Sequence, residues 1–224
     1  MIEFDTVTLE RGGRVVLEPL SLSLTERRIG VIGANGSGKS SFARLLNGLL
    51  LPTSGAVRVF GLDTAQVPRD VRRRVGFVFQ NPDNQIVYPG VAEDLAFGLK
   101  PLKVGKAETA QRVTEALSEA GLSGFDNRLT HELSGGEKQM VAIAGVMILR
   151  PDILVLDEPT TLLDRRNKRR VMRAVEAMRQ SVVMITHDLD LLDGFDRVLV
   201  FERGRLVADA PPSEAIPAYI EITS

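Results

Sequence analysis

The stretch that decides the fold runs Gly33-Ala-Asn-Gly-Ser-Gly-Lys-Ser-Ser41. Its spacing matches G-x-x-x-x-G-K-[ST], a pattern that needs a strand before it and a helix after it. The apolar run 29–32 predicts the strand, and apolar residues three and four positions apart predict a helix over 40–50. The stretch is therefore expected to be a phosphate-binding loop and not a flexible linker.

The chemistry of such a loop comes from its backbone and from two side chains. Glycines let backbone N–H groups turn inward around phosphate oxygens, and the helix N-terminus adds further N–H groups. Lys39 is expected to reach the β- and γ-phosphates, and Ser40 to ligate Mg²⁺. The residues predicted to hold the phosphates are Asn35, Gly36, Ser37, Gly38, Lys39, Ser40 and Ser41.

A carboxylate at the end of a second strand is expected to complete this half of the site. The apolar run 153–156 is followed directly by Asp157 and Glu158. Asp157 is expected to act on Mg²⁺, directly or through water. Glu158 is expected to accept a proton from an attacking water.

Strand-like and helical patterns alternate along most of the chain, which predicts an α/β protein with a parallel sheet. Early strands without helices between them suggest an antiparallel edge or subsheet. Joints at 101–105 and 121–127 would flank a helical insertion. The predicted strands are 2–7, 20–24, 28–32, 75–79, 153–156 and 182–186, with a terminal hairpin over 197–208. The predicted helices are 40–50, 91–99, 106–120, 135–149 and 165–179.

Composition narrows the functional classes. The 224 residues are 44% hydrophobic with a formal net charge of -1, which suits one sizeable domain or a domain with a subdomain. The absence of cysteine excludes a disulfide framework and a cysteine-ligated metal. No apolar run approaches the length of a membrane span, so a membrane role is expected to act through a partner.

Two basic clusters, at 72–74 and 165–170, raise the question of nucleic-acid binding. No aromatic residues are interleaved with the charges, so solvated helix faces are the favoured interpretation. A position near a membrane partner or lipid headgroups is a further alternative.

Further motifs connect these pieces to a known family. Leu133-Ser-Gly-Gly-Glu-Lys-Gln139 lies about twenty residues before the strand that ends in Asp157. With it, the chain resembles the nucleotide-binding subunits of ABC transporters. Phe79-Gln80 resembles the family's Q-loop, 161–164 its D-loop, and Thr186-His187-Asp188 its switch histidine. The resemblance covers essentially the whole chain.

The resemblance implies a fold in one ABC ATPase domain, 1–224. It would be a P-loop NTPase core with a mostly parallel sheet, an antiparallel β-subdomain at the N-terminus and a helical subdomain carrying the signature. The RecA-like core would span about 1–85 and 151–224, and the helical subdomain about 86–150.

The resemblance also implies Mg²⁺-dependent ATP hydrolysis and the roles of further residues. Gln80 would sense Mg²⁺ and the attacking water, and His187 would hold the γ-phosphate. Asp164 would link two nucleotide sites. Arg11 stands where the family usually has an aromatic residue that stacks on adenine; a guanidinium plane can stack as well.

The signature implies a second copy of the chain. In the family, the positions of Ser134, Gly135 and Gly136 face the γ-phosphate bound to the other subunit. One chain carries one phosphate loop and one signature. The resemblance therefore implies two chains, head to tail, that enclose two ATP molecules.

The stretches 80–85 and 91–98 resemble one branch of the family, the energy-coupling factor (ECF) transporters. There, the segment after the Q-loop receives a membrane coupling subunit, and an exposed Gln85 would suit such a docking groove. The implied partners are this subunit and a substrate-binding membrane subunit, with no nucleic acid, at the cytoplasmic side of the membrane. The chain most resembles ATPases of biotin uptake, with cobalt, nickel or another vitamin as the alternative cargo.

Other functions are less favoured. A soluble ABC ATPase acting on nucleic acid or the ribosome usually has two cassettes or a long coiled-coil insertion, and the segment between Lys39 and Ser134 has no heptad run. A nucleotide-binding regulator without catalysis would lack Glu158 or His187. Two departures from the family pattern are Glu137 for a common glutamine and Leu162 for a small D-loop residue.

Overall fold

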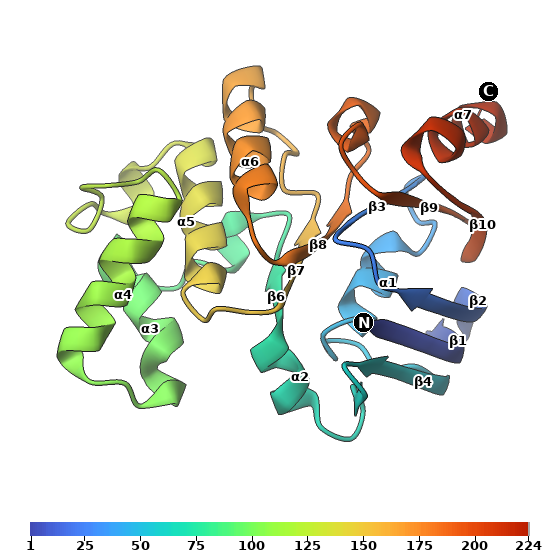
Figure 1. Ribbon diagram of the computed structural model, residues 1–224, viewed down its shortest axis with the longest axis horizontal. Helices are drawn as coiled ribbons and strands as arrows, with labels where there is room; N and C mark the ends of the chain where they lie inside the picture. Colours follow the sequence, from blue (N-terminus) through green and yellow to red (C-terminus); the bar gives the residue numbers. More distant parts are fainter. Residues whose placement is uncertain (224) are drawn as a thin grey trace. The chain divides into compact units, whose positions relative to one another are not determined.

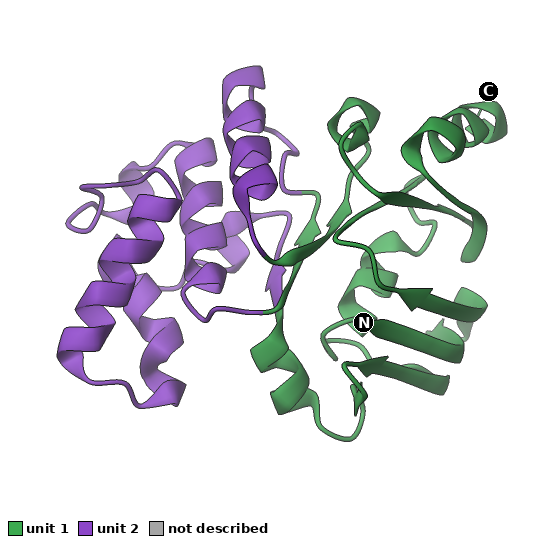
Figure 2. Cartoon of the chain, in the orientation of Figure 1, with its two compact units in different colours: residues 1–75, 152–158, 180–224 green, residues 76–151, 159–179 purple. Residues whose placement is uncertain are grey.

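The computed structural model describes residues 1–223, and contacts between residues divide the chain into two compact units (Figure 2). Unit 1 comprises 1–75, 152–158 and 180–224, and unit 2 comprises 76–151 and 159–179. The functional division into a RecA-like core and a helical subdomain stays a prediction.

Unit 1 contains an antiparallel sheet built from the N-terminal part of the chain (Figure 1). In spatial order its strands are β2 (Arg14–Leu24), β1 (Ile2–Arg11), β4 (Ser54–Val59) and β5 (Leu62–Asp63). Ile2, Phe4, Val7 and Leu9 of β1 are buried, so one face of the strand packs on the core. The predicted antiparallel subsheet is confirmed.

The second sheet of unit 1 is mostly parallel. Its neighbouring strands are β10 (Arg205–Ala210), β9 (Arg197–Glu202), β3 (Arg28–Gly33), β8 (Ser181–Ile185) and β7 (Ile153–Asp157). β3 runs parallel to β8 and β9, β7 runs parallel to β8, and β10 is antiparallel to β9. Every residue of β3 and β7 is buried, as is typical of parallel strands covered on both faces. The predicted α/β fold class is confirmed.

Helix α1 (Lys39–Leu45) contacts both sheets: β2 on one side, and β3, β7 and β8 on the other. Its Phe42 ring lies 4.9 Å from the Phe4 ring and 5.0 Å from the Phe201 ring, and is completely buried. Burial of such a ring stabilises the fold by about 1.5–3 kcal/mol. Phe42 therefore fixes the beginning of α1, directly after the phosphate loop.

Helix α1 is shorter than the sequence pattern predicts, and that prediction of 40–50 is wrong at its end. The helix ends at Leu45, and the N–H groups of Leu49 and Leu50 both donate to the Arg44 carbonyl oxygen. Gly48 has φ +67°, a left-handed conformation that typically terminates helices.

Several elements of unit 1 were not predicted. Besides β4 and β5, these are α2 (Pro68–Arg74), the short 3₁₀ helix η4 (Leu189–Leu192) and α7 (Pro212–Thr223). Helix α7 packs on β9 and β10 and contains Pro217 in its interior, where a proline usually indicates a helix end. β6 (Val75–Val78) leads the chain from unit 1 into unit 2.

Unit 2 is helical. Its α-helices are α3 (Val91–Leu99), α4 (Lys106–Glu119), α5 (Gly135–Met147) and α6 (Arg165–Ala177), and its 3₁₀ helices are η1 (Pro82–Asn84), η2 (Lys100–Leu102) and η3 (Thr130–Glu132). Helices α3, α4 and α5 pack against one another, and α6 packs against α5 (Figure 1). Within 1–223, no helix combines the length and apolarity that crossing a membrane requires.

Candidate functional site

The phosphate loop depends on two glycines. Gly33, the last residue of β3, has φ +148°, and a Cβ atom there would overlap the Phe201 carbonyl oxygen. Gly38, which precedes α1, has φ +103°, and a Cβ atom would lie 2.9 Å from the Val16 carbonyl oxygen. A larger residue at either position would strain the backbone and displace the neighbouring strand. β9 and β2 therefore hold the loop from two sides.

Lys39 lies beneath the loop. Its Nζ donates hydrogen bonds to the carbonyl oxygens of Gly33 at 2.7 Å and Ala34 at 2.8 Å, and the residue is 5% exposed. Burial lowers the pKa of Lys39, while the nearby carboxylates of Glu158 and Asp157 act in the opposite direction. An ammonium group has three N–H donors, so one remains for a phosphate oxygen.

The Ser37 hydroxyl gives an independent indication of a ligand. Ser37 is 2% exposed, and its Oγ has no hydrogen-bond partner within residues 1–223. A buried polar group without a partner is costly and calls for an explanation. An oxyanion bound at the loop would supply one, so the residues present fit a phosphate ligand.

Ser40 and Asp157 bring two oxygen ligands together. The Ser40 Oγ donates a hydrogen bond to Asp157 Oδ1 at 3.0 Å, although the residues come from α1 and β7. Burial raises the pKa of Asp157, against the hydrogen bond from Ser40 and the positive charge of Arg44. Mg²⁺ prefers such oxygen ligands and usually takes further ones from phosphate and water. The pair therefore fits a magnesium ion bound together with a phosphate chain.

Glu158 and His187 follow neighbouring parallel strands, β7 and β8. Glu158 has the left-handed φ of +51°, and its N–H donates to the Ile185 carbonyl oxygen at 3.0 Å. Its Oε2 lies 3.4 Å from Nδ1 of His187, whose side chain is 58% exposed, against 15% for Glu158. Because β3, β8 and β7 are parallel neighbours, their carboxyl ends meet at one edge, where α/β proteins bind ligands.

Unit 1 thus brings Lys39, Ser40, Asp157, Glu158 and His187 to one edge of its parallel sheet. The remaining loop residues differ in exposure: Asn35 and Gly36 are exposed, and Ser41 is half-buried in α1.

Arg11 ends β1 and is exposed, opposite Arg14 in the β1–β2 hairpin. Its stacking on adenine stays a prediction.

In unit 2, the signature forms the capped beginning of α5. Ser134 and Glu137 form a capping box: Glu137 Oε2 accepts from the Ser134 N–H at 2.8 Å and from its Oγ–H at 2.7 Å. The hydrogen bonds from the Ser134 hydroxyl and backbone, with Arg128 nearby, lower the pKa of Glu137. The Ser134 hydroxyl was predicted to face a phosphate. In the structure it donates its hydrogen bond to the carboxylate of Glu137, the residue that replaces the family's common glutamine.

The D-loop and the signature meet through a residue that sequence reasoning missed. Asp164 caps α6: its Oδ1 accepts from the Asn167 N–H at 2.8 Å and its Oδ2 from Asn167 Nδ2 at 3.1 Å. A Cβ atom on Gly136 would overlap the Asn167 side chain. The signal for the cap was available, since an aspartate directly before a helical pattern is a typical N-cap.

The segment after the Q-loop differs from expectation at Gln85. This side chain was predicted to be exposed for docking, but it is half-buried and bonded internally at both ends of its amide. Its Oε1 accepts from the Phe79 N–H at 3.2 Å, and its Nε2 donates to the Ala142 carbonyl oxygen of α5 at 2.7 Å. The exposed positions nearby are Asn81, Asp83 and Asn84. The role of Gln80 stays a prediction.

The glycine loop between β3 and α1, with its buried lysine and the aspartate on a nearby strand, defines the class: a phosphate-loop nucleotide-binding protein. The family model described as ABC transporter matches residues 17–161. A relative from Deinococcus radiodurans is 59% identical over 221 residues, covering 99% of this chain and 98% of its own length. This relative is named as an ABC transporter ATP-binding protein, and its name does not say which substrate is transported.

Two further relatives have more specific names. The biotin transport ATP-binding protein BioM of Rhizobium etli is 51% identical, with 100% of this chain and 99% of the relative covered. The energy-coupling factor transporter ATP-binding protein EcfA of Syntrophomonas wolfei is 44% identical, with 90% and 77% covered.

Two solved structures share the fold. CbiO1 of Clostridium perfringens, described as part of the ABC transporter complex cbiONQ, has a TM-score of 0.87 at 29% identity, with 99% of this chain and 93% of that chain covered. The dimeric ATP-binding cassette MJ0796, bound to ADP and Pi, has a TM-score of 0.83 at 27% identity, with 95% and 99% covered.

This chain belongs to the ATP-binding proteins of ABC transporters. It binds ATP, and it is an ATPase whose hydrolysis is coupled to transport.

Proposed function

We propose that the chain energises the import of biotin through an ECF-type transporter, as a head-to-tail pair on the cytoplasmic side of the membrane. The observation that carries this proposal is the match to BioM of Rhizobium etli along the full length of both chains. The EcfA relative supports the ECF branch. Cobalt or nickel, the alternative cargo, is distinguished from biotin by the uptake measurement below.

In this proposal, unit 1 binds the phosphates of the nucleotide. The loop N–H groups and the remaining donor of Lys39 bind the β- and γ-phosphates. Ser40 and Asp157, whose side-chain oxygens lie 3.0 Å apart, would hold Mg²⁺. The ion would supply positive charge that offsets the negative charge of the phosphates.

Glu158 and His187 act on the attacking water and on the γ-phosphate. Glu158 accepts a proton from the attacking water, and its left-handed backbone turns its carboxylate toward His187 and not along β7. The His187 side chain is largely exposed, and its imidazole lies beside the Glu158 carboxylate. From this position it contacts the γ-phosphate. Gln80 positions the water and senses Mg²⁺.

A second copy completes each site. Ser134, Gly135 and Gly136 of one copy face the γ-phosphate held by the loop of the other, and Asp164 links the two sites. The dimeric form of MJ0796, a neighbour at 27% identity, supports a paired arrangement. Binding of ATP closes the pair, and hydrolysis with product release reopens it.

The coupling subunit is proposed to dock on unit 2 near the Q-loop segment. Val87 is 69% exposed and Phe97 is 43% exposed, an apolar surface that a partner would cover. The Phe97 ring lies 5.0 Å from the ring of Tyr88, the residue that follows Val87. Substituting Val87 by glutamate should remove the co-purified membrane subunit while basal hydrolysis persists.

The test is uptake of labelled biotin, cobalt and nickel by cells that lack the gene, complemented with the wild-type chain or with Glu158→Gln. Restoration of biotin uptake by the wild type alone supports the proposal. Restoration of cobalt or nickel uptake instead contradicts the biotin assignment but leaves the ATPase role intact. Identification of the co-purified membrane subunits provides an independent check.

A further inference from the structure

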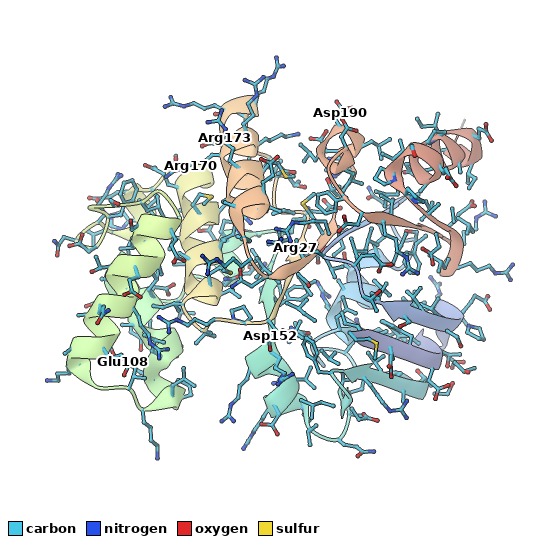
Figure 3. All side chains as sticks on the ribbon, in the orientation of Figure 1. Arg27, Glu108, Asp152, Arg170, Arg173 and Asp190 are labelled. Atoms are coloured by element: carbon cyan, nitrogen blue, oxygen red, sulfur yellow. The ribbon has the colours of Figure 1, made fainter. Side chains whose placement is uncertain are left out.

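Unit 2 has a cavity whose charge is not explained by the proposed function. The cavity, about 900 Å³, is bordered by α6, by the first turn of α5 and by Gly121. Five of its lining side chains are guanidinium groups: Arg165, Arg166, Arg169, Arg170 and Arg173. Figure 3 labels Arg170 and Arg173 beside α6. The volume lies in the range of small-molecule sites.

The five arginines share one face of α6, which we call the arginine face. Their positions repeat at spacings of three and four residues, which a helix places on one side. The opposite side carries Val171, Met172 and Val175, which are buried. Like charges four residues apart repel each other along the arginine face, and a bound anion would relieve that repulsion.

The cavity contains little that neutralises this charge. Its two carboxylates are already engaged: Glu137 by Ser134 and Arg128, and Asp164 by Asn167. Within residues 1–223, none of the five arginines forms an ion pair. Arg170 donates to the Gly121 carbonyl oxygen, which orients its guanidinium without neutralising it.

We propose that the arginine face of α6 binds a small polyphosphate anion, at a site separate from the phosphate loop. Guanidinium groups bind phosphate oxygens through paired hydrogen bonds, and several phosphates in a chain match several guanidiniums along a helix. The hollow shape favours a small anion over a flat membrane surface. Because Ser134 and Asp164 also border the cavity, an occupant would lie against the groups proposed to meet the second copy.

The experiment measures binding of inorganic tripolyphosphate by calorimetry to the full chain carrying Lys39→Ala, which disables the phosphate loop. Saturable binding is expected. Adding Arg169→Ser with Arg173→Ser should weaken it at least about tenfold, since two charge-assisted contacts are lost. The matched control is Arg69→Ser with Arg73→Ser, two exposed arginines at the same spacing on α2, which should leave the affinity unchanged.

Absence of saturable binding, or an equal loss from the control pair on α2, would overturn the proposal. A second arm tests flotation of the same variants with phosphatidylglycerol vesicles. Vesicle binding that depends on Arg169 and Arg173, without tripolyphosphate binding, would also overturn it in favour of a lipid surface. Arg165→Gln with Arg166→Gln repeats the test at the other end of the arginine face, with thermal melting to verify folding.

Discussion

At the scale of single residues, Asp157 and Glu158 show how two adjacent carboxylates take different environments. Asp157 completes β7, is 4% exposed and bonds Ser40, whereas Glu158 turns into a left-handed conformation and lies beside His187. The sequence pattern predicted both acids at the strand end. It did not predict the turn, because glutamate does not favour positive φ and the tertiary contacts must hold it there.

Gly136 illustrates a close approach that sequence alone does not reveal. Gly136→Ala should lower the free energy of unfolding by about 1–3 kcal/mol, because the new methyl group overlaps Asn167 and forces α5 and α6 apart. Chemical denaturation measures this change. Gly145→Ala in the same helix is the control: its Cβ meets open space, so it should stabilise by about 0.5–1 kcal/mol. Equal effects would contradict the account.

The environment of Glu137 in the signature predicts that the stability of the chain depends on pH. Its pKa is lowered in the folded chain, chiefly by the Ser134 hydrogen bonds, so its contribution to stability is complete above the unfolded pKa of about 4.3. That contribution should disappear as pH falls through the folded pKa. Glu137→Gln should therefore be less stable than the wild type at pH 7, by about 0.5–1 kcal/mol, and the difference should shrink in acid.

Unfolding curves of both chains between pH 7 and pH 3 provide the measurement. Glu119→Gln, at an exposed position of α4, is the control and should change little at any pH. A constant difference between wild type and Glu137→Gln across this range would contradict the capping role.

At the scale of elements, α5 connects the Q-loop segment with the signature. Lys138 Nζ donates to Asp83 Oδ1 at 2.7 Å, and the Ala142 carbonyl oxygen accepts from Gln85. Lys138 and Ala142 are four residues apart and share one face of α5. A displacement of the Q-loop segment would thus act on the helix that begins with the signature.

Gln85→Ala should uncouple the two segments. It removes both hydrogen bonds of the amide and leaves the Phe79 N–H without its side-chain acceptor, at a cost of about 1–3 kcal/mol in stability. Asn84→Ala, one residue earlier and exposed, should cost almost nothing. Thermal unfolding of the two variants measures the difference, and similar melting temperatures would show that Gln85 does not hold the segment.

Helices and strands with a regular spacing of apolar residues were predictable from the sequence. Elements whose bounds depend on tertiary contacts were not. The helix predicted over 91–99 has those bounds in the structure, because its apolar spacing is regular. Helix α1 was predicted too long because the Gly48 turn overrides the leucine pattern. Helix α7 was missed because packing on β9 and β10 offsets the cost of Pro217.

At the scale of the whole molecule, motif order along the sequence was sufficient to predict the family and the fold class. The order of loop, Q-loop, signature, acidic strand end and histidine places each motif at the beginning or end of an element in the structure. The sequence could not predict the partner of Gln85, because its hydrogen bond to the Ala142 carbonyl oxygen depends on three-dimensional packing. The caps that join Glu137 to Ser134 and Asp164 to Asn167 are local, since their partners lie three residues apart.

In the proposed function, two copies of the chain share each ATP site, and the signature of one completes the phosphate loop of the other. The decisive measurement is the solution mass of Glu158→Gln with ATP and Mg²⁺, by light scattering, alongside the count of bound nucleotides. We expect slowed turnover and a particle of twice the 24.5 kDa chain mass that holds one ATP per chain. Adding Ser134→Arg should return the mass to that of a single chain while ATP stays bound. A particle that stays single with ATP, or pairing that survives Ser134→Arg, would contradict the account.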